Sequence, residues 1–320
     1  MPLFDMPLEQ LRAYRPQRDE PADFDAFWDG TLAQAREAAG APLFTRVDSG
    51  LSLVTVDDVE FAGGDGDPVR AWLVLPKGDI AGCVVSYLGY SHGRGLPHQH
   101  LTWAAAGWAN LVMDSRGQGA SARAAVGATG DPHGTDHAQS SGMMTKGISS
   151  PDTYYYRRLF TDAVLAVDVA AAHDRIDPAR IVVAGGSQGG AIAQAVAGLR
   201  NDLLAAFIDV PFLSHFSRAL DLASTGPYPE LVEYLAGQRL DADRVMRTLS
   251  YFDGMHFAAR ATTTARYSVA LRDTTCPPST VFAAYNHWGG EAEIDVWPWN
   301  EHEGGMAFQT EIQLDLLRRL

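Results

Sequence analysis

Apolar residues recur along this chain in two alternating patterns. The short apolar runs that are typical of buried strands cover 82–88, 109–113, 180–184, 206–210, 265–271 and 292–297. Stretches with apolar residues at helical spacing lie between and after them, at 101–106, 154–173, 188–198, 279–285 and from Met306 onward. Strands that alternate with helices predict an α/β fold with a mostly parallel central sheet flanked by helices.

The amino-terminal part of the chain departs from this alternation. Residues 1–50 are polar and favour helix, and one amphipathic helix is predicted over 23–39. Two strand-like segments follow at 52–61 and 69–75. A loop rich in Gly, His and Ser is predicted over 115–150.

A second departure lies at 212–262. This stretch contains helix-like pieces at 230–236 and 241–249 and no clear strand. We interpret it as a helical insertion over the carboxyl edge of the sheet, where α/β sheets bind ligands. We therefore expect a single domain over 1–320, with a helical extension at 1–50.

Composition and charge exclude several classes of partner. The chain has 320 residues, of which 46% are hydrophobic and 20% charged, as in ordinary soluble domains. Its formal charge of −14 repels phosphate backbones and anionic membrane surfaces, so we expect no nucleic-acid and no membrane partner. No stretch approaches the roughly 18 apolar residues of a membrane helix, and the first residues do not resemble a secretory signal. We expect a cytoplasmic protein.

The two cysteines, Cys83 and Cys276, form no CxxC pair and do not cluster with histidines. The sequence therefore predicts free, partly buried thiols rather than a disulfide or a metal site.

Candidate chemistry is concentrated in the sequence GGSQGG at 185–190. It contains the pattern G-x-S-x-G, follows the apolar run at 180–184 and opens the helix predicted at 188–198. A serine on a sharp strand-to-helix turn exposes its hydroxyl, and glycines are required where side chains would collide with neighbouring backbone. The motif alone is also compatible with a plain tight turn. Its context favours Ser187 as the nucleophile of an α/β-hydrolase fold.

A serine nucleophile needs a histidine base and an acid that orients the base, and in this fold they follow in the order Ser, acid, His. Four histidines follow Ser187, and His302 is the one placed after the last predicted strand, before the final helix. Asp273 ends the preceding strand, although an aspartate there is also suited to cap a helix. The predicted triad is Ser187, Asp273 and His302. The fallback or structural residues are Asp209, Asp253, His215, His256 and His287.

The tetrahedral intermediate of acyl transfer needs two backbone N–H donors. Gln188, directly after the nucleophile, is one candidate. Tyr90, which follows the run at 82–88, is the other, although its glycine-rich surroundings also fit a flexible turn. In RGQG (116–119), we expect Arg116 to pair with a carboxylate rather than to act in catalysis.

Together these motifs resemble carbohydrate esterase family seven, which contains the acetyl xylan esterases and cephalosporin-C deacetylases. The resemblance covers nearly the whole chain. The sequences that carry it are FDAFW (24–28), GYSHGRG (89–95), RGQG (116–119), GGSQGG (185–190), DTTCPPSTVFAAYNH (273–287) and HE (302–303). The chain departs from the usual family pattern at Leu88, Ser115 and Ala270, where histidine, threonine and glycine are common. None of these departures removes a catalytic atom.

The resemblance implies a serine esterase that removes acetyl groups from small O-acetylated substrates, such as acetylated xylo-oligosaccharides and cephalosporin C, and that needs no cofactor and no metal. It implies Ser187, Asp273 and His302 as the triad. It also implies the backbone of Tyr90 and Gln188 as the oxyanion hole, with Tyr90 against the substrate. Members of the family are typically cytoplasmic hexamers, built as a ring that encloses the active sites.

A cramped acyl pocket beside Ser187 is implied as well, and Tyr90, Trp103, Pro211 and Phe212 are bulky candidates for its walls. The residues by themselves leave alternatives open, because a fold does not fix its chemistry. A peptidase, a cofactor-free haloperoxidase-like hydrolase and a broader short-chain carboxylesterase all use the same triad. A non-catalytic binding protein would have no need of an intact triad.

Overall fold

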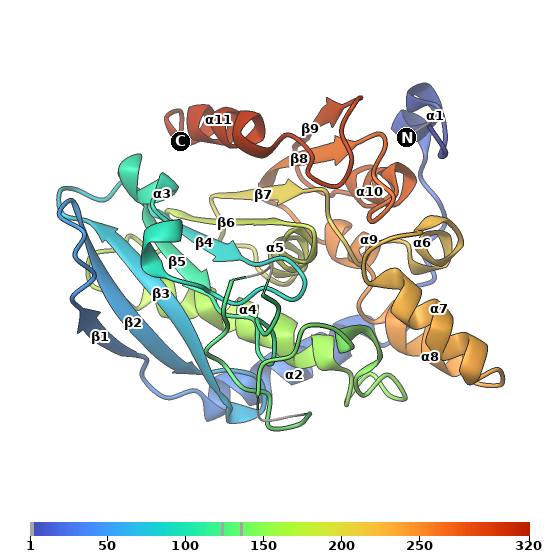
Figure 1. Cartoon of the computed structure of the whole chain (residues 1–320), viewed down its shortest axis with the longest axis horizontal. Coiled ribbons are helices and arrows are strands. Elements are labelled where there is room, and N and C mark those ends of the chain that lie inside the picture. The colour runs from blue at the N-terminus through green and yellow to red at the C-terminus, as the bar shows by residue number, and fades with distance from the viewer. Residues whose placement is uncertain (1–2, 123–124, 135–136) are drawn as a thin grey trace.

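In the computed structural model, which describes residues 3–122, 125–134 and 137–320, helices cover both faces of one mixed sheet (Figure 1). The strands are β1 Leu43–Val47, β2 Val54–Ala62, β3 Pro68–Pro76, β4 Cys83–Tyr87, β5 Ala109–Met113, β6 Ile181–Gly186, β7 Ala205–Asp209, β8 Thr264–Ala270 and β9 Ala292–Trp297. The α-helices are α1 Leu8–Ala13, α2 Phe24–Ala38, α3 Thr102–Ala105, α4 Tyr155–Ala171, α5 Gln188–Leu199, α6 Phe216–Leu222, α7 Tyr228–Gly237, α8 Ala242–Ser250, α9 Gly254–Ala258, α10 Pro278–Tyr285 and α11 Met306–Leu317. The short 3-10 helices are η1 Gly64–Gly66, η2 Pro97–Gln99 and η3 Met143–Thr145.

The strand order in the sheet is β1-β2-β3-β5-β4-β6-β7-β8-β9. The pairs β1–β2, β2–β3 and β3–β5 are antiparallel, and all the other neighbouring pairs in this order are parallel. Every strand-like segment of the sequence corresponds to one of the strands β2 to β9. The predicted α/β-hydrolase class with a mostly parallel sheet is confirmed.

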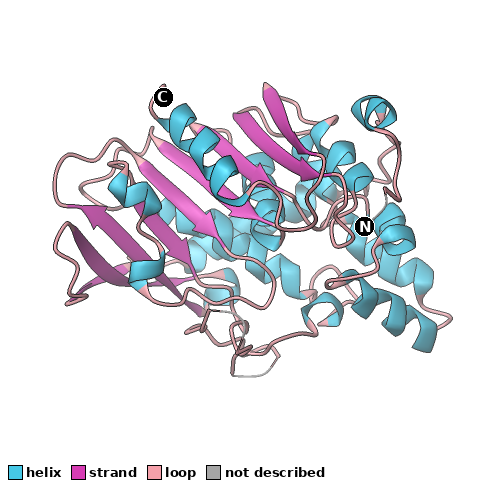
Figure 2. Cartoon of the chain, turned by 45° about the horizontal axis from the view of Figure 1, so that its top comes forward, coloured by secondary structure: helices cyan, strands magenta, loops and turns pink. Residues whose placement is uncertain are grey.

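Side chains of the central strands alternate between the two faces of the sheet. Val85 and Val183 belong to the large apolar core that α2, α4 and α5 complete. Val84 and Val182 point the other way, into a smaller cluster closed by the end of α11. Figure 2 shows α11 across this second face, with most of the helices on the opposite side. The sheet is therefore buried on both faces, and its carboxyl edge is left for loops.

The helical extension predicted at 1–50 is wrong in one part, because β1 (Leu43–Val47) lies within it. β1 pairs antiparallel with β2 at the edge of the sheet. Its side chains are mostly exposed, so no apolar alternation marks it in the sequence. Backbone pairing and an ion pair from Arg46 to Asp57 (2.6 Å) hold this strand in place.

Between β7 and β8 the chain forms the four helices α6, α7, α8 and α9. The sequence pattern predicts α7 and α8 but not the short helices α6 and α9. Every residue of α9 is buried, so no amphipathic contrast marks it. α9 packs closely on α5, since a Cβ on Gly198 would lie 2.4 Å from the carbonyl oxygen of Phe257. The start of α7 reaches the carboxyl edge of the sheet, where Pro227 and Glu230 line a cavity together with Ser187.

Both cysteines are buried free thiols, as the sequence predicts. Burial raises the pKa of the Cys83 thiol to about 12, so this group stays protonated. Among the described residues, no helix combines the length and the apolar character that a membrane crossing requires.

Arg116 pairs with a carboxylate, as the sequence predicts, and it does so in the core. Its guanidinium donates to both oxygens of Asp162 in α4 (2.6 Å each) and to Asp67 (2.8 Å). Arg116 and Asp162 are fully buried, and Asp162 also accepts from the backbone N–H of Gly64 (2.7 Å). Burial raises the pKa of the Asp162 carboxyl, and Arg116 opposes that rise. The pair anchors the RGQG loop to α4 and η1.

Replacing Arg116 with Ala leaves Asp162 buried without its cation. We expect the free energy of unfolding to fall by about 3–5 kcal/mol, because an uncompensated charge then remains in the core. The matched control is Arg318→Ala, whose side chain is 75% exposed, with an expected change below about 0.5 kcal/mol. Urea unfolding of both variants at one protein concentration measures the difference. A loss at Arg116 no larger than that at Arg318 contradicts the prediction.

Candidate active site

Ser187 occupies the turn between β6 and α5. Its backbone has φ 58° and ψ −119°, a conformation that residues other than glycine rarely adopt. Strand and helix approach closely here: a Cβ on Gly185 would lie 2.3 Å from the carbonyl carbon of Gly189, and a Cβ on Gly189 would lie 2.3 Å from the carbonyl oxygen of Tyr87. Only glycine fits at these two positions, as the motif predicts. The turn leaves Ser187 partly exposed, whereas the residues that follow it in α5 are buried.

His302 and Asp273 form a continuous hydrogen-bonded chain with Ser187. His302 Nε2 lies 2.9 Å from Ser187 Oγ, and His302 Nδ1 lies 2.8 Å from Asp273 Oδ2. Asp273 follows β8, and His302 lies between β9 and α11. Because β8 and β9 are parallel neighbours, their carboxyl ends bring the acid and the histidine to the same edge. The structure thus brings together the three residues of the predicted triad.

The surroundings of Asp273 determine how the histidine is oriented. Asp273 is fully buried, and its Oδ1 accepts from the backbone N–H groups of Thr275 (2.8 Å) and Cys276 (2.9 Å). A carboxylate only accepts, so we assign the proton shared with His302 to Nδ1, and Nε2 is then the acceptor for the Ser187 hydroxyl. Asp273 does not cap a helix, because α10 begins at Pro278 with Pro277 as its N-cap residue; its Oδ1 holds the loop before that helix while its Oδ2 orients His302. Such an arrangement is what nucleophilic attack by a serine requires.

The two candidate oxyanion donors, the backbone N–H groups of Gln188 and Tyr90, come from the start of α5 and from the loop after β4. Gln188 is the first residue of α5, so its N–H has no acceptor within the helix, and the helix terminus favours negative charge there. Tyr90 follows β4, the parallel neighbour of β6, and lines the same cavity as Ser187. Within the described part of the chain, neither N–H forms a hydrogen bond. Both donors are therefore free to bind an oxyanion.

Gln118 connects the loop that carries Tyr90 to the start of α5, a contact that sequence reasoning missed. Its Oε1 accepts from the backbone N–H of Ser91 (2.6 Å). Its Nε2 donates to Gln188 Oε1 (3.0 Å) and to the Tyr155 hydroxyl (2.8 Å). The signal was present in the sequence as RGQG, whose arginine is structural and whose glutamine braces the site.

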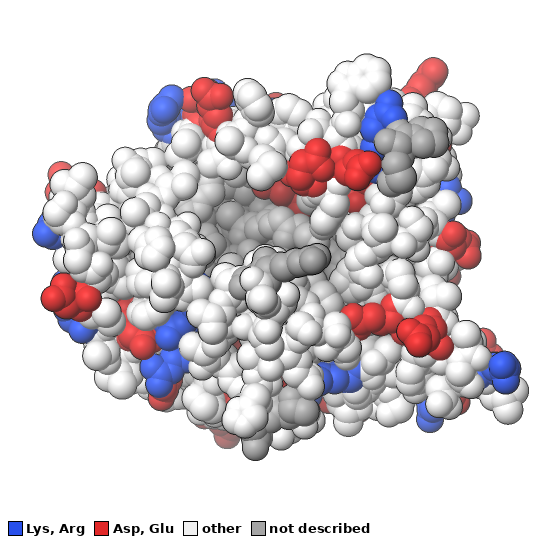
Figure 3. All heavy atoms as spheres, in the orientation of Figure 1, with Lys and Arg blue, Asp and Glu red and all other residues white. Residues whose placement is uncertain are grey.

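A cavity of about 440 Å³ opens beside Ser187 and His302. Its other described lining residues come from loops at the carboxyl edge and from the start of α7, and they are Gly89, Tyr90, Ser91, His92, Ser140, Ser141, Gly226, Pro227, Glu230 and Thr275. Figure 3 shows the hollowed face of the molecule, seen as in Figure 1. The exposed surface of the cavity wall is mostly apolar, with a few hydroxyl groups and one carboxylate set into it.

The bulky residues considered for the pocket walls divide between two places. Tyr90 lines the cavity, and Phe212 packs behind it with ring centroids 6.5 Å apart. The prediction for Trp103 is wrong: its ring lies 6.2 Å from Phe207, at the smaller apolar cluster on the α11 face. Trp103 belongs to α3, which precedes β5 and so lies away from the carboxyl edge of the sheet.

One group of three potential metal ligands was found among the described residues, namely Asp273, Cys276 and His302, with ligand atoms within 4.8 Å of one another. Asp273 and His302 already bind each other. Burial raises the pKa of the Cys276 thiol well above its usual value, which disfavours the thiolate that metals bind. The group is therefore better suited to proton transfer than to holding a metal ion.

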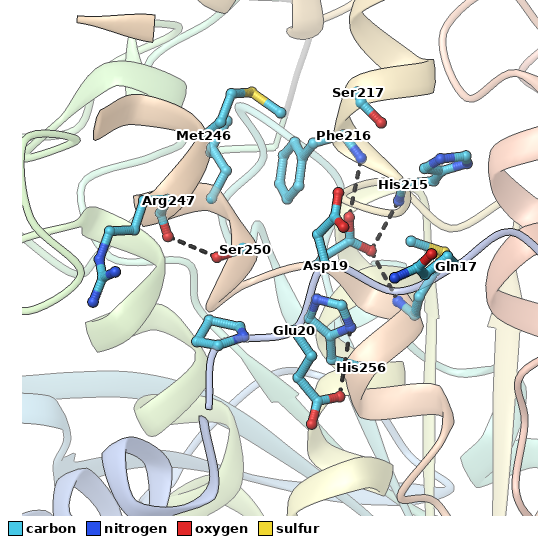
Figure 4. A pocket seen from close by; sticks show the side chains of 14 residues that line it. Gln17, Asp19, Glu20, His215, Phe216, Ser217, Met246, Arg247, Ser250 and His256 are labelled. Carbon is cyan, nitrogen blue, oxygen red and sulfur yellow. Dashed lines mark hydrogen bonds and ion pairs between the residues drawn. The ribbon is translucent and has the colours of Figure 1, made fainter. Parts of the chain in front are cut away.

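His215, His256 and Asp253 lie elsewhere. The two histidines line a separate cavity of about 320 Å³ between the amino-terminal segment, α6 and α8 (Figure 4). Asp253 accepts from the backbone N–H groups of His215 (2.9 Å) and Phe216 (3.0 Å). This cavity shares no lining residue with the cavity beside Ser187. The rings of His215 and His256 pack on Tyr14 and Phe24, although neither buried Nδ1 has a hydrogen-bond partner among the described residues. None of the three residues takes part in the hydrogen-bonded chain.

The last two fallback residues are structural as well. His287 Nδ1 lies 2.7 Å from the carbonyl oxygen of Ala283, within its own helical turn. Asp209 accepts from Ser268 Oγ and Gln313 Nε2, both at 2.8 Å. Burial raises the pKa of Asp209 to about 6. Both of its oxygens are occupied, so it does not replace Asp273.

Comparisons with known proteins agree with this geometry. The acetyl xylan esterase (AXE1) family model matches residues 1–320. The chain is similar to an acetyl xylan esterase from Paenibacillus sp. R4, with a TM-score of 0.90 and 37% identity over 98% of this chain and 99% of that one. It is also similar to acetyl xylan esterase 1 from Thermoanaerobacterium sp. JW/SL YS485, with a TM-score of 0.88 and 30% identity over 98% of this chain and 99% of that one.

A curated relative, the acetyl esterase Axe7A of Xylanibacter ruminicola, is 25% identical over 314 residues. The match covers 90% of this chain, which spans 65% of the length of that relative. The resemblance to carbohydrate esterase family seven that the motifs carried is confirmed, because the acetyl xylan esterase family model matches the whole chain. The chain belongs to the acetyl xylan esterase family, a family of carboxylic ester hydrolases.

Proposed function

We propose that the protein removes acetyl groups from small O-acetylated substrates through an acyl-enzyme on Ser187. The observation that carries this proposal is the chain from Ser187 through His302 to Asp273, with separations of 2.9 and 2.8 Å, in a member of the acetyl xylan esterase family. No cofactor enters the proposed reaction.

In the first half of the reaction, Ser187 Oγ attacks the acetyl carbonyl carbon while His302 Nε2 takes the hydroxyl proton. The backbone N–H groups of Tyr90 and Gln188 donate to the oxyanion. His302 then gives the proton to the leaving alcohol, and the acetyl group remains bound to Ser187 Oγ as an ester. In the second half, a water molecule attacks the carbonyl carbon of this ester while His302 takes its proton. His302 then returns the proton to Ser187 Oγ, and acetate is released.

We propose acetylated xylo-oligosaccharides and the acetoxymethyl group of cephalosporin C as substrates. The relatives named acetyl xylan esterase support the first class. Hydroxyl groups of Ser140, Ser141 and Thr275 on the cavity wall fit a polar alcohol, and Tyr90 is proposed to contact the substrate. A broader short-chain carboxylesterase is the alternative activity.

Replacing Ser187 with Ala is expected to lower esterase turnover by about 10⁴–10⁶-fold with the fold intact, since the nucleophile is lost. The measurement is hydrolysis of p-nitrophenyl acetate by purified protein. Ser250→Ala is the matched control, because the Ser250 hydroxyl donates to the carbonyl oxygen of Arg247, away from the triad. A Ser187 variant that keeps more than a few per cent of the activity would exclude the nucleophile assignment.

Acyl-chain length tests the acetyl specificity. A methylene that fits an apolar pocket gains about 0.8 kcal/mol, whereas one forced into a filled pocket costs about 1–3 kcal/mol. We expect kcat/KM to fall severalfold from acetyl to butyryl esters of p-nitrophenol and to be barely measurable for octanoyl. A maximum at butyryl or longer would keep Ser187 as nucleophile and favour the broader carboxylesterase.

We also propose a cytoplasmic protein that assembles as a closed hexamer, as the family resemblance implies. Trp299, Met306 and Phe308 are 78%, 69% and 70% exposed around the start of α11, and such apolar surface supports self-association. Light scattering is expected to give the mass of a closed ring of 34.6 kDa chains. A monomer at every concentration tested would reject the assembly.

A further inference from the structure

Glu230 is the one carboxylate among the described residues that line the cavity of about 440 Å³ beside Ser187. A second cavity of about 340 Å³ also borders Ser187 and His302, and its lining includes Asp209 and Glu303. It belongs to α7, in the insertion between β7 and β8. The Tyr90 hydroxyl lies 2.9 and 2.8 Å from its two oxygens, and the backbone N–H of Gly142 donates to Oε2 at 3.1 Å. The carboxylate is thus held against the loop that carries one proposed oxyanion donor.

The contacts of Tyr90 fix the position of this charge. Its hydroxyl donates to Glu230 and accepts from the backbone N–H of Met143 (2.8 Å). Burial, and after it the neighbouring Glu230, raises the pKa of the Tyr90 phenol well above its usual value, so the phenol stays a donor. Three segments that are distant in the sequence therefore meet at one carboxylate, which has little freedom to turn out of the cavity.

The rest of the cavity does not neutralise this charge. None of its described lining residues is Lys or Arg, and within the described part of the chain Glu230 forms no ion pair. The acid of the triad, Asp273, lies buried behind His302. Figure 3 shows Asp and Glu side chains along parts of the border of the hollow. The formal charge of the whole chain, −14, has the same sign.

We propose that Glu230 is a specificity-determining residue: it disfavours esters whose alcohol carries a negative charge and favours neutral, hydroxyl-rich alcohols. A fixed carboxylate repels an anion bound in the same cavity, whereas sugar hydroxyls donate to its remaining lone pairs. This inference rests on the proposed function. It places acetylated sugars ahead of carboxylate-bearing esters such as cephalosporin C.

The test uses two acetyl esters of nearly equal shape, para-acetoxybenzamide and para-acetoxybenzoate, which differ by one negative charge. The quantity measured is the ratio of kcat/KM for the neutral ester to that for the anionic ester. Glu230→Gln keeps an oxygen that accepts from Tyr90 and Gly142 but removes the charge. We expect the ratio to fall by about threefold or more in this variant and to fall in the wild type as salt is added.

Glu233→Gln is the matched control, since Glu233 is an exposed residue of the same helix that does not line the cavity. It changes the net charge of the protein by the same amount, and we expect the wild-type ratio. Glu230→Ala gives a second measurement if the Gln variant folds poorly, because the ratio cancels a loss of rate common to both esters. Equal ratios in the wild type, both Glu230 variants and Glu233→Gln would overturn the proposal.

The same measurements separate a failure of the proposed function from a failure of the role proposed for Glu230. If the wild type hydrolyses neither ester, the proposed function is wrong. If it hydrolyses para-acetoxybenzamide through Ser187 and the ratio is insensitive to Glu230, the function stands and the role of Glu230 is wrong.

Discussion

The close approach of α5 to the sheet at Ser187 is the constraint on which the rest of the site depends. Backbone atoms fill the space that a Cβ on Gly185 or Gly189 would need, so the strand can turn into the helix within one residue. That residue takes a strained conformation with φ 58°, which the buried packing of α5 maintains. Because the serine is held at the carboxyl edge, the ends of β8 and β9 are near enough to supply Asp273 and His302.

A second set of contacts connects the region around Ser187 to the core. Two residues of the RGQG loop have different partners. Arg116 is held in the core by Asp162, whereas Gln118 contacts the loop that carries Tyr90 and the start of α5 at Gln188. Oxyanion donors act through their position, so a brace that links both loops to the core bears directly on the chemistry. Stability and preorganisation are thus connected through one short loop.

The insertion contributes the other side of the cavity. α7 brings Glu230 to Tyr90, and the long loop before α4 closes on the same pair through Gly142 and Met143. The part of the site that faces an alcohol is therefore assembled from segments outside the parallel strands. Because the same fold and triad serve several reactions, we propose that these added segments help to set which alcohol fits.

The sequence by itself predicted the fold class, the strands β2 to β9 and the three residues of the triad. The reason is that buried strands, strand-to-helix turns and the order Ser, acid, His each leave a local pattern. Exposed β1 and fully buried α9 leave no such pattern, so only the three-dimensional packing reveals them. Tertiary structure alone decided the contacts of Gln118 and Glu230. Their partners, Ser91 and Tyr90, lie far away in the sequence, and a polar residue on a predicted loop or helix carries no mark of the contact it will make.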